Sequence, residues 1–536
     1  MKKILTVMVI ALMGAQLFAG GDTKIKFEWG PEYKIPKKHG DLGFVGNSEV
    51  GYTQITHKYG ADLTLQHFDT RLNLGSTNTL NLKSMPKGYM SEAFVEAAGG
   101  KNYWLFTTWD KKTQTERLFS YEMDVKKGAF IGEAKELISV VGKLSGNLVM
   151  TGYMKFNTGD KYQVVLSSDK KRILVYYRRK PEEKRDKLNK DKIGYYVYDE
   201  NMKELWHSET EMPYTEAMMD NVDYQVDASG TIYLLARVYN SEPEKHKERV
   251  YHLSLLKWAK DDKKAVEIKV PVDKNFLRET VLTEDKNGKL IIAGYYSKDM
   301  KRSGVDGAFV LKLDEGSNTI SNLKKGYYEF PASVLAEFES SRSKRKMDKK
   351  DAKGDLQADN LLLRKVVVND DGSIEMYGEQ YYYTMYVVMT NSGPRTNYSY
   401  FFDDVIALRI REDGELAWVK KIPKAQMGNN TTIGLGIKQF SYAGNSYVFF
   451  LDNEKNTNIT PDKAPARHMA GHGGFLMAVK IGPDGTMSKS QVFDIRKEKF
   501  QVQPTNFDKV GDNQMIVRCT KGLFGGGPSK AALITF

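Results

Sequence analysis

Four acidic residues with the chemistry of a hydrolase stand close together in the sequence: Glu375, Glu379, Asp403 and Asp404. A glycosidase needs two carboxylates a few ångström apart, one to protonate the leaving group and one to act as base or nucleophile. The spacing along the chain does not decide whether any two of these residues form such a pair. An envelope glycan hydrolase with its site at a central channel is therefore kept as an alternative hypothesis.

Two other motifs resemble ligand sites only in outline. His468 and His472 have a spacing that suits a metal ion on a helix, but the glycines around them oppose a helix. The glycine-rich segment 522–530 lacks the Gly-Lys-Ser/Thr ending of a phosphate loop and is predicted to be a hairpin loop. The single cysteine, Cys519, lies in an apolar run and is predicted to be a buried core residue. No metal site, catalytic residue or cofactor is predicted.

Aromatic residues are concentrated in one segment, which makes it a candidate for ligand contact. Tyrosine offers a large contact area with a polar tip and is favoured at binding sites. Tyr398 and Tyr400 are predicted to contribute most to binding. The cluster consists of Tyr381, Tyr382, Tyr383, Tyr386, Tyr398, Tyr400, Phe401 and Phe402.

Basic residues are concentrated in four segments, at 178–192, 240–249, 297–306 and 342–353. Together these hold 21 Lys or Arg and 11 Asp or Glu, an excess of ten. Without Lys2 and Lys3, the chain's net charge of +12 becomes +10, which equals this excess. The rest of the mature chain is therefore neutral. Clustered positive charge steers and holds an acidic partner, although the same lysines could serve only solubility. The residues predicted to bind a partner are Arg178, Arg179, Lys344, Arg345, Lys346, Lys349 and Lys350.

A repeated turn indicates how these residues are positioned. Eight times a short Gly, Asn, Asp or Ser turn precedes an aromatic or β-branched run, which is typical of hairpins. Residues 221–270 show four strands in succession, at 221–226, 231–239, 250–259 and 265–270. The sequence predicts an all-β fold, a single β-propeller of eight four-stranded blades, with seven as the alternative if the turn at 46–48 is not a hairpin. The turns start at residues 46, 98, 167, 227, 284, 369, 443 and 511.

The last repeat has too few residues for a fourth strand, because only two apolar runs follow residue 513. The segment 25–35 is predicted to supply that strand, closing the ring and leaving no open sheet edge. Long insertions fall only between the second and third strands of a blade, or between blades. They are therefore predicted to build one face, with a Tyr-rich loop at 384–403 and a basic, partly helical insertion at 332–358.

The N-terminus has the layout of a secretory signal peptide over residues 1–19, with Lys2 and Lys3 ahead of an apolar stretch. The mature propeller domain is then 20–536. No later segment approaches 18 uninterrupted apolar residues, so no transmembrane helix is predicted. We expect an exported protein of the periplasm or outer surface of a Gram-negative bacterium.

The segment 378–426 resembles uncharacterised secreted propeller-like proteins of Bacteroidota bacteria. The shared features are a Glu-Gln-Tyr-Tyr strand, an Asp-Val strand, a turn ending in Trp418, and a close at Lys424 and Gln426. The resemblance implies export and a propeller, and it implies no activity. The sequence therefore predicts a non-catalytic propeller that binds an envelope protein or acidic glycan through its long-loop face, with no nucleic-acid partner.

Overall fold

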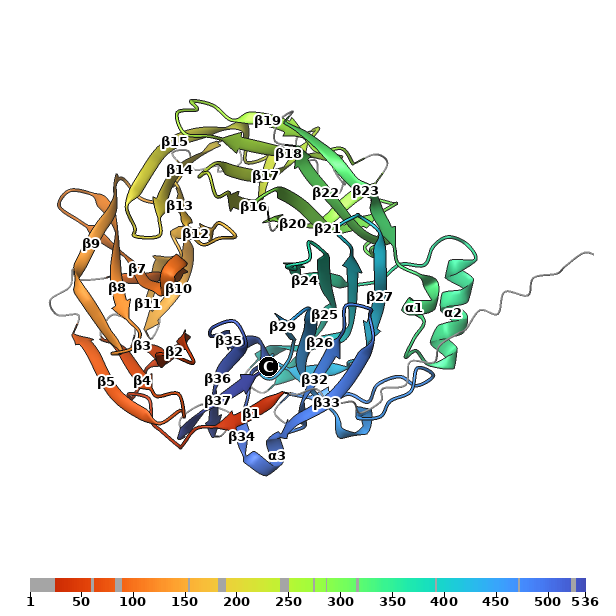
Figure 1. Ribbon diagram of the computed structural model, residues 1–536. Coiled ribbons are helices and arrows are strands. Elements are labelled where there is room, and N and C mark those ends of the chain that lie inside the picture. Colours follow the sequence, from red (N-terminus) through yellow and green to blue (C-terminus); the bar gives the residue numbers. More distant parts are fainter. Residues whose placement is uncertain are drawn as a thin grey trace, which may run out of the picture.

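Eight sheets are arranged as blades in a closed ring around a central axis (Figure 1). The computed structural model describes residues 25–58, 62–81, 89–152, 155–181, 189–241, 250–272, 275–285, 287–314, 318–390, 393–470, 473–521 and 527–536. Within these residues the helices are short and lie outside the blades. The prediction of an eight-bladed propeller is confirmed.

The strands of each blade run from this axis outwards in chain order. Blades 1 to 4 are formed by β2 (Gly40–Asn47), β3 (Gly51–Lys58), β4 (Asp62–Phe68) and β5 (Leu74–Asn81); β6 (Met90–Ala97), β7 (Lys101–Asp110), β8 (Thr115–Asp124) and β9 (Ala129–Val141); β12 (Tyr162–Leu166), β13 (Arg172–Arg178), β14 (Lys190–Asp199) and β15 (Glu204–Thr215); and β16 (Met219–Val226), β17 (Ile232–Tyr239), β18 (Tyr251–Trp258) and β19 (Val266–Lys269). A separate hairpin, β10 (Asn147–Gly152) and β11 (Lys155–Gly159), joins blades 2 and 3.

Blades 5 to 8 follow the same order, with additions at blade 6 and closure at blade 8. They are formed by β20 (Phe276–Glu284), β21 (Leu290–Ser297), β22 (Gly307–Asp314) and β23 (Thr319–Glu329); β24 (Leu361–Val368), β25 (Ile374–Thr390), β26 (Gly393–Ile410) and β27 (Leu416–Ile422), with β28 (Gln426–Asn429) and β31 (His468–Met469) alongside; β29 (Lys438–Tyr442), β30 (Asn445–Asp452), β32 (Phe475–Ile481) and β33 (Met487–Asp494); and β34 (Phe500–Gln501), β35 (Asp508–Lys509), β36 (Gln514–Lys521), β37 (Ser529–Thr535) and β1 (Lys26–Trp29).

Each predicted turn joins the first and second strands of a blade. The turn at 227–230 connects β16 to β17, and Gly230 adopts a φ of 89°, which favours glycine. The turn at 46–48 connects β2 to β3, so it is a true hairpin. The seven-blade alternative is therefore wrong.

The two ends of the chain close the ring, as predicted. β1 pairs antiparallel with β37, from Lys26 opposite Thr535 to Trp29 opposite Ala532. The ring of Trp29 lies 5.2 Å from Phe493 and 6.0 Å from Phe500, measured between centroids. β1 thus covers the outer edge of β37 and becomes the outermost strand of the last blade.

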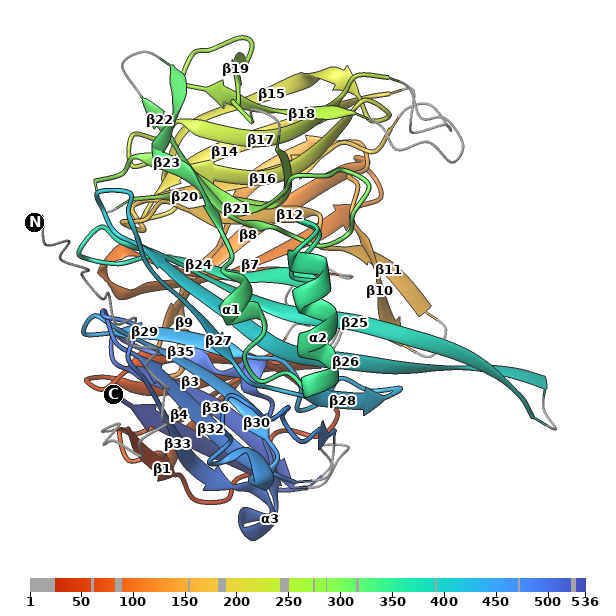
Figure 2. The ribbon, with the colours of Figure 1, turned by 90° about the vertical axis from the view of Figure 1, so that its right-hand side faces the viewer.

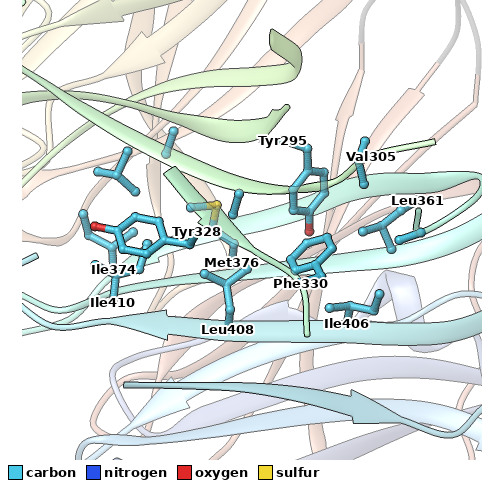
Figure 3. Packing of buried hydrophobic residues seen from close by; sticks show 14 of the residues in the cluster. Tyr295, Val305, Tyr328, Phe330, Leu361, Ile374, Met376, Ile406, Leu408 and Ile410 are labelled. Carbon is cyan, nitrogen blue, oxygen red and sulfur yellow. The ribbon is translucent and has the colours of Figure 1, made fainter. Parts of the chain in front are cut away.

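Hydrophobic cores lie between blades, and each of the eight interfaces has one. Between blades 5 and 6, Tyr295 and Phe330 pack edge to face with centroids 5.9 Å apart (Figure 3). Met376 and Leu408 complete this core from blade 6. Because both faces of a blade are covered by its neighbours, its middle strands are apolar on both sides.

Carboxylates add polar links between neighbouring innermost strands. Glu92 accepts a hydrogen bond from the Lys161 backbone N–H at 2.8 Å, joining blades 2 and 3. Asp223 accepts from Leu282 N–H at 2.7 Å, and Asp508 accepts from Phe44 N–H at 2.8 Å. Burial raises the pKa of Glu92 to about 8 and that of Asp508 to about 6.

One of the two insertions differs in form from the sequence prediction. The segment 384–403 is not a loop, because β25 and β26 continue through it as a two-stranded ribbon that projects from the ring (Figure 2). Its alternating aromatic and β-branched residues pair across the two strands, which explains the difference. In the segment 332–358 the apolar start forms only α1 (Ala332–Leu335), and the basic run itself forms α2 (Ser341–Asp351).

Helix α2 is capped by Ser340, the residue before it, whose side chain accepts a hydrogen bond from Ser343 N–H at 3.2 Å. α3 (Ile495–Glu498) is a single turn after blade 7. No helix in the described ranges is long and apolar enough to cross a membrane. The predicted signal peptide lies outside the described residues and stays a prediction.

We expect that a chain starting at residue 37 will lose about 5 kcal/mol of folding free energy relative to a chain starting at residue 25. Ile25, Phe27 and Trp29 pack against the core between blades 7 and 8, and burying such side chains contributes about 1.5–3 kcal/mol each. Urea unfolding of both chains checks this. Equal stability would show that β1 does not hold the ring closed.

Glu92→Gln is expected to stabilise the protein at pH 8.5 by about 1–3 kcal/mol and to have little effect at pH 4.5. The raised pKa of Glu92 means that the folded state binds more protons than the unfolded state between the ordinary glutamate pKa and about 8. Stability from this group is therefore complete at low pH and is lost as the pH rises through that window. Unfolding free energies at both pH values measure the effect, and an unchanged pH profile would contradict it.

Candidate functional site

The ribbon of β25 and β26 is the most exposed apolar feature in the described part of the chain. Seven of the fifteen exposed large hydrophobic residues belong to it, including Met385 at 67% and Met389 at 76% exposure. From Tyr383 to Thr390 the strand spans eight residues, about 27 Å at roughly 3.4 Å per residue. Soluble proteins rarely leave so contiguous an apolar surface open, which marks the ribbon as a candidate interaction site. The seven residues are Tyr383, Met385, Tyr386, Val387, Val388, Met389 and Tyr398.

The two faces of the ribbon differ in chemistry. Directly opposed residues of antiparallel strands share a face, and successive residues alternate between faces. We define the apolar face by its paired residues, which are Tyr383 with Tyr400, Met385 with Tyr398, Val387 with Thr396 and Met389 with Pro394. The opposite face pairs Thr384 with Ser399, Tyr386 with Asn397 and Val388 with Arg395. One face is therefore a nearly continuous stripe of Tyr, Met and Val.

A buried ionic cluster holds the root of the ribbon. Glu379 is 1% exposed and lies 2.9 Å from the Lys424 ammonium and 2.8 Å from the Arg364 guanidinium. Lys424 is fully buried and also donates to the Phe402 carbonyl at 2.7 Å. Removing one partner of such a cluster leaves an uncompensated buried charge, so the cluster fixes the strands where the ribbon leaves the blade.

A second ion pair ties the helical insertion to the same root. The Lys421 ammonium lies 3.0 Å from Asp404 and 3.0 Å from Glu339, which precedes α2. Burial alone would lower the pKa of Lys421, but these two carboxylates together raise it. Burial raises the pKa of Asp404. The insertion is thus held against blade 6 by charge as well as by apolar contact.

Aromatic residues cover both faces of the root. Tyr382 stacks on Phe401 with centroids 4.6 Å apart, and Arg467 lies over Phe401 at 5.1 Å. On the apolar face, Tyr381 packs on Phe402 at 4.9 Å, with Arg364 5.7 Å from the Tyr381 ring. Tyr398 stacks on Tyr400 further out, at 6.1 Å. The predicted contact residues Tyr398 and Tyr400 therefore lie side by side on the apolar face.

The predicted basic residues of the insertion lie on α2, beside the ribbon root (Figure 2). Lys346 and Lys350 line a cavity of about 260 Å³ together with Gln380 of β25. Lys350 pairs with Asp359 at 3.6 Å, and Lys344 donates to the Pro461 carbonyl at 3.2 Å. Arg345 and Lys349 are exposed on the same helix. The insertion and the ribbon thus form one neighbourhood on the ring.

Arg178 and Arg179 do not join this neighbourhood. They belong to blade 3, on the left of the ring in Figure 1, whereas α2 lies on the right. Arg178 pairs with Asp191 at 2.7 Å and Glu216 at 3.2 Å, and Arg179 pairs with Glu209 at 2.8 Å. Arg178 and Arg179 are therefore separated around the ring from the basic residues of α2.

The four carboxylates of the hydrolase hypothesis each lie in an ion pair. Glu375 pairs with Arg409 at 3.2 Å, and Asp403 pairs with Arg467 at 3.0 Å. Glu379 and Asp404 belong to the buried pairs with Lys424 and Lys421. These ion pairs give all four carboxylates a structural role in blade 6. None of the four positions therefore supports the hydrolase hypothesis.

The remaining sequence motifs add no chemistry to the site. His468 is buried in β31, and His472 lies outside the described residues. Across the described ranges, no group of three His, Cys, Asp or Glu side chains could hold a metal ion. Cys519 is buried in β36, where desolvation raises the pKa of its thiol. Residues 522–526 of the glycine-rich segment also lie outside the described residues.

Sequence reasoning missed Met385, Val387 and Met389 as site residues. Their alternation with Thr384, Tyr386 and Val388 was the available signal, because it is the period-2 pattern of a strand with two unlike faces. It also missed Lys424 and Arg364 as partners of Glu379. Arg364 lies in β24 and Lys424 in the connection between β27 and β28, so no spacing in the sequence reveals them.

No protein-family model matches this sequence, and no curated protein matches it. Similar solved structures include a polysaccharide lyase, Uly1, at 12% identity and a TM-score of 0.38, covering 83% of this chain and 89% of that one. The propeller domain of the Trilobed protease from Pyrococcus furiosus is 9% identical, with a TM-score of 0.35 and coverage of 86% and 97%. A protein of unknown function from Bacteroides caccae is 9% identical, with a TM-score of 0.27 and coverage of 69% and 93%. At this level of similarity they carry no conclusion about the chemistry of this chain.

Lys424→Met is expected to cost about 3–5 kcal/mol of folding free energy, because the buried Glu379 carboxylate then has only Arg364 as an ionic partner. A matched control is Lys298→Met, which breaks the exposed pair with Glu329 and should cost less than about 1 kcal/mol. Denaturant unfolding of both variants measures the difference. Equal costs would show that the cluster does not hold the root of the ribbon.

Proposed function

We propose that this chain is an exported binding propeller that holds a partner protein on the apolar face of the blade 6 ribbon. The observation that carries the proposal is the exposed stripe of Tyr383, Met385, Val387 and Met389 opposite Tyr398 and Tyr400. Aromatic residues and methionine are enriched at protein interfaces, and Tyr is a frequent hot-spot residue. Export rests on the N-terminal pattern at residues 1–19.

The architecture of the ribbon supports a protein partner. An isolated two-stranded hairpin is only marginally stable in water, and a third strand or an apolar cover stabilises it. β28 pairs with β26 as far as Ser399, and Asn360 accepts from Tyr381 N–H on the other side. Beyond these residues the described ribbon has no further strand beside it. A partner that covers the apolar face or adds a strand along the β25 edge would complete the sheet.

The basic helix α2 favours an acidic rim on that partner. α2 carries Arg342, Lys344, Arg345, Lys346, Lys349 and Lys350 at the root of the ribbon. Charges at the edge of an interface accelerate association and select among partners more than they add affinity. The apolar stripe would then hold the partner, while α2 would orient it.

The experiment places a photo-crosslinking amino acid, benzoylphenylalanine, at position 398 on the apolar face. The matched control carries it at position 397, the neighbouring residue on the opposite face. In cells that produce the protein, we expect a discrete protein adduct from position 398 and little or none from position 397.

A second pair of variants tests the same face without a crosslinker. Replacing Met385, Val387 and Met389 by serine should weaken the captured complex about 100-fold, and replacing Thr384, Tyr386 and Val388 by alanine should weaken it only a few-fold. Melting curves of both triple variants confirm that the ring stays folded. No adduct, equal adducts from both positions, an adduct with lipid, or an adduct of two copies of this chain would each overturn the proposal.

A further inference from the structure

Acidic and basic residues are unevenly distributed among the innermost strands of the ring. The innermost strands of blades 1 to 5 hold seven acidic residues and one arginine, whereas those of blades 6 to 8 hold four basic residues and one aspartate. The innermost strands therefore form an acidic arc and a basic arc of the ring. The four basic residues are Arg364, Lys365, Lys438 and Lys509.

These four basic residues line one cavity of about 500 Å³, formed where blades 6, 7 and 8 meet. No acidic side chain lines it, and Gln439, Ser441 and Thr505 add neutral hydrogen-bonding groups. The cations come from three different blades, so the ring itself fixes their spacing. A pocket with several convergent cations and polar groups is suited to a multiply charged anion.

The lysines of this cavity lack the acidic partners that occupy other basic residues of the protein. Arg364 is paired with Glu379, but no ion pair joins Lys365, Lys438 or Lys509 to a carboxylate in the described part of the chain. Lys438 is only partly exposed. Burial, together with nearby Lys365, lowers its pKa, and Asp508 offsets this in part. A bound anion would relieve this unfavourable positive charge, which is the physical reason to expect one.

We propose that this cavity binds a small polycarboxylate, with Lys365, Lys438 and Lys509 each contacting a carboxylate group. The site differs from the exposed apolar face of the ribbon, and Arg364 at the ribbon root is the residue that lies next to both. Its ligand is a molecule with two or more carboxylates, and both free organic acids and acidic oligosaccharides have that chemistry. Gln439, Ser441 and Thr505 would accept or donate hydrogen bonds to hydroxyl groups of either.

Isothermal titration calorimetry with two probes distinguishes a free organic acid from an acidic oligosaccharide as the ligand. Citrate presents three carboxylates without a sugar, trigalacturonate presents three on an oligosaccharide, and maltotriose is the neutral control. We expect citrate or trigalacturonate to bind, with affinity that falls as salt rises, and maltotriose not to bind. Binding of citrate alone would assign a free organic acid, and stronger binding of trigalacturonate would assign an acidic sugar.

Lys365→Gln and Lys438→Gln should each weaken binding at least about tenfold, because each removes a charge-assisted contact. Lys269→Gln, on the exposed outer strand β19, is the matched control and should leave binding unchanged.

If Lys438→Gln fails to fold, Lys509→Gln tests the same cavity from an exposed position. Absence of binding by both acids at millimolar concentration, or unchanged affinity in the folded cavity variants, would overturn the proposal. The triple serine variant of the ribbon should bind as the wild type does, so failure here and failure of the ribbon proposal are distinguishable.

Discussion

Closure of the ring is the constraint on which the rest of the structure depends. Each blade is covered on both faces by its neighbours, and eight separate cores fill the eight interfaces. A missing or unpaired blade would expose two of these cores at once. The pairing of β1 with β37 prevents that, since it completes the last blade with residues from the opposite end of the chain. The carboxylate links from Glu92, Asp223 and Asp508 then fix the innermost strands relative to one another.

Blade 6 departs from this pattern because two of its strands continue beyond the ring. Leaving the ring removes the neighbouring blades that stabilise every other strand, so the ribbon root needs another source of rigidity. The buried cluster of Glu379, Lys424 and Arg364 supplies it, together with the flanking strand β28. Buried ion pairs seldom add much net stability, but they select one arrangement of the strands over others. The ribbon therefore leaves the blade in a defined direction while its outer half stays open.

The two proposed sites, the apolar face of the ribbon and the cavity between blades 6, 7 and 8, would bind their ligands through different interactions. Both include residues of blade 6. Arg364 lies at both, because its guanidinium is near the Tyr381 ring at the ribbon root and the same residue is part of the cavity lining. The ribbon offers apolar area to a macromolecule, whereas the cavity offers separated positive charges to a small anion. The Glu379 carboxylate neutralises Arg364, so the positive charge left open in the cavity belongs to the lysines.

The sequence by itself indicated eight blades, with seven as the alternative, together with the order of their strands and the closure by residues 25–35. These features depend on which residues occupy the turns and on the alternation of side chains along each strand. Both can be identified from residues that are neighbours in the sequence. It also indicated where the aromatic residues gather, but the prediction of a loop at 384–403 was wrong, because β25 and β26 pair through this segment. Only the tertiary structure decided that Glu379 meets Lys424 and Arg364, that Arg178 lies far from α2, and that Lys365, Lys438 and Lys509 share one cavity. These are contacts between strands and blades distant in the chain, and strand register and ring geometry, rather than sequence spacing, set them.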